Sequence, residues 1–384
     1  MGPGQWHGNS LIDGVFAWFR ESHSTALFRA RFPLLLSLCS GICLLGPPLR
    51  AAVPKGVFSL ATAGHPCAET VLQNPDVDGV SIRQAWADLE PSEGTFDWSF
   101  LDSEVSRAAA AGKQVLLRIN TQASKPAWVT AAVTEAGGTF YSFLEDDGVE
   151  TTIPVYWDPT FLAKKKAMIT ALGAHFTSNP AIVIVWTSFA NAHSEDWSVP
   201  HTSSEIEAWH AAGYTTDKLL DAGKQIIDTT MAAFPKQYVT LAIAGNGGLD
   251  PDPNYAARNA ILAARATWPG RLIVQKNNLA AFNPPAPGTD SVFEPLWDSR
   301  PDIGGQMLWN CSNDTSYRMN NSVADAPATI LHKSVDAGAA YEMNYIEIYQ
   351  VDVLNLPDEI AYAHKRLLGL LTEPKPPNGL KVDP

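Results

Sequence analysis

The feature that most constrains the fold of this chain is a regular alternation of short β-branched runs with longer helical patterns. Units of this kind build a parallel sheet that carries helices on its faces. Eight strands are predicted, at residues 57–61, 80–84, 114–120, 181–187, 238–243, 271–275, 303–309 and 344–349. Helices are predicted at residues 99–111, 160–175, 216–234, 255–267, 326–337 and 358–371.

Eight strand–helix units in one chain favour an α/β fold of the closed (β/α)8 type, the TIM barrel, over an open doubly wound sheet. No glycine-rich fingerprint follows the first strand, so nothing supports the dinucleotide-binding alternative. Two long excursions interrupt the pattern. Residues 137–157 are predicted to form a β-hairpin inserted after the third strand, and residues 189–213 form a second insertion after the fourth.

The N-terminal residues have the pattern of a secretory leader. Arg20, Arg29 and Arg31 precede an apolar run at residues 32–46, which is shorter than the ~20 residues that span a bilayer. We therefore expect a signal peptide at residues 1–52 that is cleaved, no stable membrane insertion afterwards, and a secreted or periplasmic protein. The barrel is predicted to occupy residues 53–375, and residues 376–384 are predicted to be a disordered tail.

Two cysteines remain after the expected cleavage, Cys67 and Cys311. In an oxidising compartment they have the option of pairing, but two isolated cysteines are equally consistent with free buried thiols. The sequence leaves both alternatives open.

Charge and aromatic content narrow the class of ligand. The net charge of −13 argues against a nucleic-acid or anionic-membrane partner. Twelve tryptophans, several of them in predicted loops, fit a protein that stacks rings against the flat apolar faces of sugars, although tryptophan is also a common core residue. A carbohydrate partner is expected, and the oligomeric state is left open.

The inner face of the predicted barrel is marked by polar residues at alternate strand positions. Successive strand residues point to the barrel axis and to the helix layer in turn. On the last strand Ile346 and Ile348 alternate with Glu347, so the carboxylate is expected to point inward. The other inward polar residues near strand C-terminal ends are Ser81, Arg83, Arg118, Asn120, Gln275, Asn277, Gln306 and Asn310. Barrel active sites are built at this end.

Glu347 is the first candidate for catalysis. Hydrolysis of sugars normally uses one ionised carboxylate, which attacks or activates water, and one protonated carboxyl group, which donates to the leaving oxygen. Nearby guanidinium groups of Arg83 and Arg118 would favour the charged form of Glu347. The alternative is that Glu347 only balances one of these arginines in a structural ion pair.

Glu195 is the candidate for the second carboxyl group. It follows the fourth strand, and Phe189 and Trp197 are placed to desolvate it, which would favour its protonated form. The alternative is a solvated turn, in which case Asp196 and His193 are the fallback candidates.

Other chemistries find no support in the sequence. The nine histidines show no zinc-type spacing, and no Gly-x-Ser-x-Gly elbow is present. The acidic run at residues 249–254 contains two prolines and is interpreted as a turn rather than a calcium loop. We expect neither a metal nor a cofactor.

The second and third units carry a resemblance to a known group of enzymes. Residues 82–86 read Ile-Arg-Gln-Ala-Trp, residues 89–98 read Leu-Glu-Pro-Ser-Glu-Gly-Thr-Phe-Asp-Trp, and residues 112–118 and 126–129 continue the pattern. In these segments the chain resembles the (β/α)8 clan of glycoside hydrolases that includes cellulases, xylanases and family 42 type β-galactosidases. The resemblance implies a secreted, cofactor-independent glycosidase that acts on an oligosaccharide or polysaccharide, with retention of anomeric configuration preferred.

On this interpretation Glu347 and Glu195 are the predicted catalytic pair, and a further set of residues is predicted to bind the sugar. That set is Arg83, Trp86, Arg118, Asn120, Trp128, Asn191, Trp197, Gln275, Asn277, Gln306, Trp309 and Tyr345.

The chain departs from the clan pattern at the two catalytic positions. Clan members place Asn-Glu at the end of the fourth strand, whereas here Asn191 is followed by Ala192. Their nucleophile usually ends the seventh strand, whereas Glu347 falls on the eighth predicted strand. Three explanations stay open: a miscounted strand, a relocated carboxylate pair, or a barrel that binds glycans without catalysis.

Overall fold

A computed structural model describes residues 52–144, 150–187, 199–200, 202–245 and 248–371 of the chain. Within this part, eight parallel strands close into a barrel in the order β1-β10-β9-β8-β7-β6-β3-β2. The strands are β1 (Gly56–Leu60), β2 (Gly79–Ala85), β3 (Gln114–Asn120), β6 (Ile182–Thr187), β7 (Tyr238–Ala242), β8 (Leu272–Leu279), β9 (Ile303–Met307) and β10 (Tyr345–Tyr349). The predicted fold class is confirmed.

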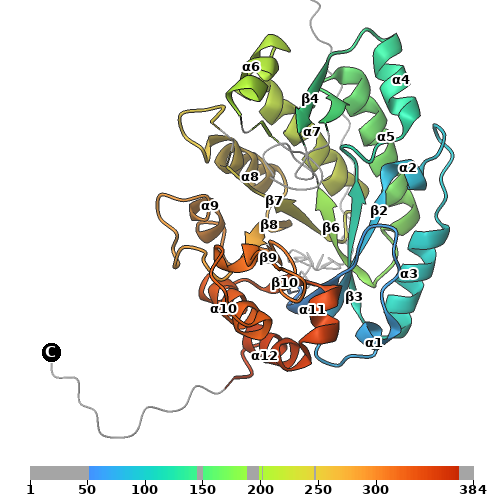
Figure 1. Cartoon of the computed structure of the whole chain (residues 1–384). Coiled ribbons are helices and arrows are strands. Elements are labelled where there is room, and N and C mark those ends of the chain that lie inside the picture. Colours follow the sequence, from blue (N-terminus) through green and yellow to red (C-terminus); the bar gives the residue numbers. More distant parts are fainter. Residues whose placement is uncertain (1–51, 145–149, 188–198, 201, 246–247, 372–384) are drawn as a thin grey trace, which may run out of the picture. The chain divides into compact units, whose positions relative to one another are not determined.

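Helices surround the ring of strands (Figure 1). Those expected from the sequence are α3 (Ser99–Ala110), α5 (Pro159–Phe176), α7 (Thr216–Ala233), α8 (Tyr255–Thr267), α10 (Pro327–Ala340) and α12 (Pro357–Leu367). Shorter helices are α1 (Glu69–Leu72), α2 (Trp86–Leu89), α4 (Ala127–Glu135), α6 (Ser203–Ala211), α9 (Glu294–Trp297) and α11 (Gln350–Asn355), with a 3-10 turn η1 (Arg318–Asn320). A clear start signal is at α5, where Asp158 caps the helix by accepting from the Phe161 amide at 2.8 Å and Pro159 follows.

The half of the barrel interior nearer the N-terminal ends of the strands is filled by apolar side chains. Phe58, Leu116, Ile184, Tyr238, Ile273 and Tyr345 belong to one buried cluster inside the ring. Two glycines make room for its rings, because a Cβ at Gly79 would lie 2.4 Å from the Phe58 ring and one at Gly304 would lie 2.5 Å from that of Tyr345. This half of the interior is therefore closely packed, and the polar layer must lie nearer the C-terminal ends of the strands.

The hairpin predicted at residues 137–157 is confirmed. Strands β4 (Phe140–Leu144) and β5 (Glu150–Pro154) pair in antiparallel register. The hairpin packs against α6, which belongs to the second predicted insertion. Trp209 of α6 lies 5.2 Å from Tyr141, 5.8 Å from Tyr156 and 5.4 Å from Trp157, measured between ring centroids. Aromatic packing thus joins two insertions that leave the barrel after different strands.

Several sequence predictions fall outside the described residues or are settled by burial. Residues 1–51 of the predicted leader lie outside the described part, as does the predicted tail. Among the described helices, none is long and apolar enough to cross a membrane. Cys67 and Cys311 are both free and buried, which decides between the two alternatives that the sequence left open.

Lys276 is a buried amine on β8, and it carries a prediction for the pH dependence of stability. Its Nζ donates to the Ile243 carbonyl at 3.0 Å and lies 5.6 Å from the Phe293 ring. Burial lowers the pKa of Lys276 to about 7, from an ordinary value of ~10.4. Between these two values the unfolded chain binds a proton that the folded chain does not, so this group makes stability rise with pH across that window.

We therefore expect the free energy of unfolding of the parent to rise, relative to Lys276→Met, as the pH increases from 7 towards 10. The slope should reach at most about 1.4 kcal/mol per pH unit. Urea denaturation of both proteins at a series of pH values measures it, and groups common to the two proteins cancel in the difference. A difference that stays constant over this range would contradict the assignment.

Candidate active site

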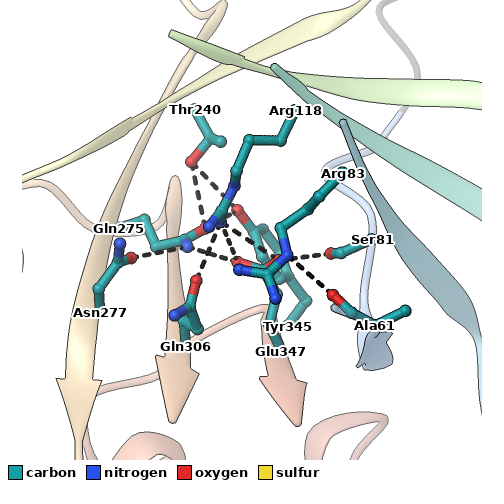
Figure 2. A network of polar contacts seen from close by, with 10 residues as sticks. All are labelled: Ala61, Ser81, Arg83, Arg118, Thr240, Gln275, Asn277, Gln306, Tyr345 and Glu347. Atoms are coloured by element: carbon teal, nitrogen blue, oxygen red, sulfur yellow. Dashed lines mark hydrogen bonds and ion pairs between the residues drawn. The ribbon is translucent and has the colours of Figure 1, made fainter. Parts of the chain in front are cut away.

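Glu347 sits inside the barrel and accepts hydrogen bonds from three other strands (Figure 2). Ser81 of β2 donates its hydroxyl to Oε1, Arg118 of β3 lies 3.1 Å from Oε2, and the Gln275 amide of β8 donates to Oε2 at 2.6 Å. The Glu347 side chain is 0% exposed. Because every one of these partners is a donor, the side chain is held in the role of an acceptor-only carboxylate.

The amide of Gln275 is oriented by Tyr345, which lies two residues before Glu347 on β10. The Tyr345 hydroxyl donates to Gln275 Oε1 at 2.5 Å, which turns the amide nitrogen towards Glu347. Burial, followed by the nearby charge of Glu347, raises the pKa of the Tyr345 phenol, so the phenol keeps the proton that it donates. The hydrogen bond from Tyr345 thus fixes the direction of the Gln275 amide.

Arg118 connects the carboxylate to two more strands. Its guanidinium donates to Gln306 Oε1 of β9 at 2.9 Å and lies 3.7 Å from the centroid of the Trp186 ring of β6. A cation packed flat on an indole is stabilised by the ring quadrupole. Arg118 is 1% exposed, so its contact with Glu347 is a buried ion pair rather than a surface one.

Arg83 and Asn277 are two further predicted residues in the same layer. Arg83 of β2 donates Nε to the Ala61 carbonyl at 2.8 Å, Asn277 accepts from Gln275 at 3.0 Å, and Asn120 is a buried residue at the end of β3. The structure thus brings together seven of the predicted residues, which are Arg83, Arg118, Gln275, Asn277, Gln306, Tyr345 and Glu347 (Figure 2).

The predicted stacking tryptophans have different surroundings. Trp86 is 0% exposed, donates to Glu90 Oε2 at 2.7 Å and packs on Trp128 and Phe161. A ring without an exposed face cannot stack on a sugar, so the prediction for Trp86 is corrected to a packing role. Trp128 is half-buried, and its indole donates to the Glu90 carbonyl at 3.0 Å. Trp309 is 40% exposed at the end of β9.

The remaining predicted residues lie outside the described part of the chain. These are the candidate acid Glu195, its fallbacks Asp196 and His193, and the sugar-binding candidates Asn191 and Trp197. Their roles stay predictions. The distance between Glu195 and Glu347 stays open with them.

Sequence reasoning missed two residues of the network, Trp186 and Thr240. Trp186 stacks on Arg118, and the Thr240 hydroxyl lies 3.1 Å from the Tyr345 hydroxyl oxygen. The signal was present, because Trp186 lies two residues after Ile184 on β6 and Thr240 lies two residues after Tyr238 on β7, and residues two apart on a strand share a face. Both therefore share the inner face. Among the described residues, no group of three or more His, Cys, Asp or Glu side chains is arranged to hold a metal ion.

The sequence model of the β-galactosidases of glycoside hydrolase family 42 matches residues 69–223, from α1 into α7. This segment holds β2, β3 and β6, which supply Ser81, Arg83, Arg118 and Trp186. Over that segment the chain is similar to these β-galactosidases. The match covers less than half of the chain and does not reach β10, the strand that carries Glu347.

One solved structure supports the barrel fold. The catalytic domain of a β-amylase from Paenibacillus polymyxa aligns with a TM-score of 0.52 and 11% identity, over 82% of this chain and 98% of that one. At this identity the likeness shows the fold alone. A xylanase B from Clostridium stercorarium F9 has a TM-score of 0.46 and 13% identity, over 77% and 86% of the two chains. A β-galactosidase from Halorubrum lacusprofundi has a TM-score of 0.47 and 12% identity, over 76% of this chain and 52% of that chain.

The topology removes one of the three explanations for the departure from the clan pattern. β9 is the seventh barrel strand and carries Gln306, and β10 is the eighth and carries Glu347. The strand count is therefore right. A relocated carboxylate and a barrel without catalysis are the alternatives that remain.

Proposed function

We propose that the protein is a glycoside hydrolase that cleaves O-glycosidic bonds of an oligosaccharide or polysaccharide. The proposal rests on the position of Glu347. Its carboxylate lies in the polar layer near the C-terminal ends of the barrel strands and accepts hydrogen bonds from donors on three other strands. The family match over residues 69–223 supports the same class of reaction. TIM-barrel enzymes place their catalytic groups at this end of the barrel.

In the proposed mechanism Glu347 is the nucleophile or the base, and Glu195 donates a proton to the leaving oxygen. Arg118 and Ser81 keep the Glu347 carboxylate oriented. A separation of about 5 Å between the two carboxyl groups gives retention, which we prefer, and about 6.5–9.5 Å gives inversion. Inward polar groups, including Arg83, Asn277 and Gln306, hold sugar hydroxyls.

The proposal includes export of the protein, which the N-terminal arginines and the apolar run at residues 32–46 support. Among the tryptophans in the described part of the chain, Trp309 has the exposed ring that stacking on a sugar requires.

A second function, glycan binding without hydrolysis, is favoured by one specific observation. Glu347 is 0% exposed and its oxygens are engaged by Ser81, Arg118 and Gln275. A carboxylate in this state serves equally well to balance a buried guanidinium. In that case the polar layer organises the barrel, and sugars bind above it.

Replacement of the candidate acid separates the two functions. We expect Glu195→Gln to lower kcat/KM by about 10²–10⁴-fold on substrates with poor leaving groups, because proton donation then fails. The loss should be much smaller on aryl glycosides, whose leaving oxygen needs little protonation. The panel consists of β-linked galacto-, xylo- and gluco-oligosaccharides and their 4-nitrophenyl monosaccharides, with product anomers followed by NMR.

Equal losses on both classes of substrate would remove Glu195 from the acid role. Binding of panel members by the parent without any hydrolysis would favour the non-catalytic barrel.

A further inference from the structure

An aromatic pair, the exposed Trp309 and the half-buried Tyr349, lies where the last two barrel strands end. Tyr349 ends β10, and Trp309 follows β9 by two residues. Their ring centroids are 6.0 Å apart with a tilt of 52°, and the Trp309 residue is 40% exposed. The exposed Trp309 ring presents an apolar surface of the kind that stacks on the apolar face of a pyranose, and the half-buried Tyr349 ring packs beside it at an angle.

The segment that carries Trp309 is fixed by Asp352 of α11. The two carboxylate oxygens of Asp352 accept from the Cys311 and Ser312 amides, each at 2.7 Å, and Asp352 is 0% exposed. Burial raises the pKa of Asp352, which reflects the cost of placing a carboxyl group there. Since Asp352 follows Tyr349 by three residues, the same short stretch supplies one ring of the pair and the anchor of the other.

The rest of this loop is also pinned. The Trp309 amide donates to Met319 Sδ at 3.1 Å, and the Met319 carbonyl accepts from the Ala281 amide at 3.0 Å. Tyr317 and Asn321, which flank η1, have left-handed backbone angles with φ of 53° and 50°. Non-glycine residues take this conformation at a cost in free energy, and such residues gather at ligand clamps and active sites. The backbone of the segment that carries Trp309 is therefore held in place before any ligand arrives.

The aromatic pair continues the site at Glu347. Residues 345, 347 and 349 share the inner face of β10, so Tyr349 lies one strand repeat beyond Glu347, about 6.6 Å along the strand. Gln306 pairs in register with Glu347 on the neighbouring strand, and Trp309 follows Gln306 by three residues. A sugar stacked on the pair would thus be the neighbour of a sugar placed over the carboxylate.

We propose that Trp309 and Tyr349 form a second sugar subsite next to the one at Glu347, and that Asp352 is the positioning residue that holds this subsite rigid. The inference rests on the proposed function and deepens it, because it makes the substrate an oligosaccharide or a longer chain rather than a monosaccharide derivative. A preformed platform binds without paying the entropy of ordering the loop.

The test is binding as a function of chain length, measured by calorimetry. The probes are β-1,4-linked galacto-, xylo- and gluco-oligosaccharides of one to six units, and the proteins are the parent, Trp309→Ala, Trp309→Phe and Asp352→Asn. Phe282→Ala is the control, because Phe282 is an exposed ring, 47% exposed, on the loop after β8. We expect the parent to gain affinity from one unit to two or three, and Trp309→Ala to lose that gain, about tenfold. Trp309→Phe should keep most of it.

Asp352→Asn is expected to bind the longer sugars more weakly, as Trp309→Ala does, and to keep an unchanged kcat on 4-nitrophenyl monosaccharides. The new amide group would face one of the two backbone N–H donors, so one hydrogen bond is lost. Equal weakening for short and long sugars would reduce Asp352 to a structural role. If Asp352→Asn fails to fold, the two Trp309 variants carry the test.

Hydrolysis is followed on the same panel, so that the two proposals fail in different ways. Binding that depends on chain length and on Trp309, without hydrolysis, keeps the subsite and overturns the catalytic proposal. Hydrolysis by the parent with Trp309→Ala unchanged at every length overturns the subsite. Absence of binding by every probe overturns it as well.

Discussion

Glu347→Gln is expected to abolish most hydrolysis, with a loss in kcat/KM of at least about 10²–10⁴-fold on every substrate that the parent cleaves. The physical reason is that an amide neither attacks the anomeric carbon nor takes a proton from water. Unlike Glu195→Gln, this variant should lose activity on aryl glycosides too, because the lost group acts on the sugar and not on the leaving oxygen. Initial rates on the 4-nitrophenyl monosaccharides and on the oligosaccharides measure both effects.

The substitution also lowers the stability of the protein, and the experiment must separate this loss from the loss of catalysis. The amide would face the Gln275 Nε2 donor and leave the Arg118 guanidinium without its countercharge, so a stability loss of about 3–5 kcal/mol is expected. Rates are therefore measured well below the melting temperature of the variant, with its fold checked by circular dichroism. Glu69→Gln is the matched control, since the Glu69 side chain is 67% exposed. A kcat/KM of Glu347→Gln within about twofold of the parent value would show that Glu347 has only a structural role, in an ion pair.

Trp209→Ala is expected to cause the largest loss of stability outside the barrel interior. Trp209 is 0% exposed and lies between the β4–β5 hairpin and the chain near Tyr214, with ring centroids 5.2 Å from Tyr141 and 5.4 Å from Tyr214. Truncation leaves a cavity in this cluster and should lower the free energy of unfolding by about 3–5 kcal/mol. Urea denaturation followed by circular dichroism measures the change.

Trp209→Phe refines this prediction. The indole Nε1 of Trp209 is buried and has no hydrogen-bond partner among the described residues, so a phenyl ring loses volume but leaves no polar group unsatisfied. We expect a cost of about 1–2 kcal/mol, well below that of alanine. Leu262→Ala, at a residue 66% exposed on α8, should change stability by no more than about 0.5 kcal/mol. A Trp209→Ala effect as small as that of Leu262→Ala would show that the hairpin and α6 are not joined through this ring.

The barrel and its inner face are predictable because their signals are local. Each strand was recognised from its own β-branched residues, and the largest error in an end is four residues, at β8 and at α12. The alternation of Ile346 and Ile348 with Glu347 likewise depends only on the two-residue period of a strand. That period places Glu347 inside the barrel before any neighbouring strand is known.

The sequence by itself therefore determined the class of fold, the inward direction of Glu347 and the resemblance to glycoside hydrolases carried by the second and third units. Only the tertiary structure decided that Arg118, stacked on Trp186, makes the 3.1 Å ion pair with Glu347, while Arg83 donates to Ala61. It also decided that Trp86 is core and Trp309 is exposed. The physical reason is that the two-residue period of a single strand decides whether a side chain points into the barrel or towards the helices. The hydrogen-bond partners and the exposure of that side chain depend on strand register around the closed barrel and on loop contacts between residues far apart in sequence.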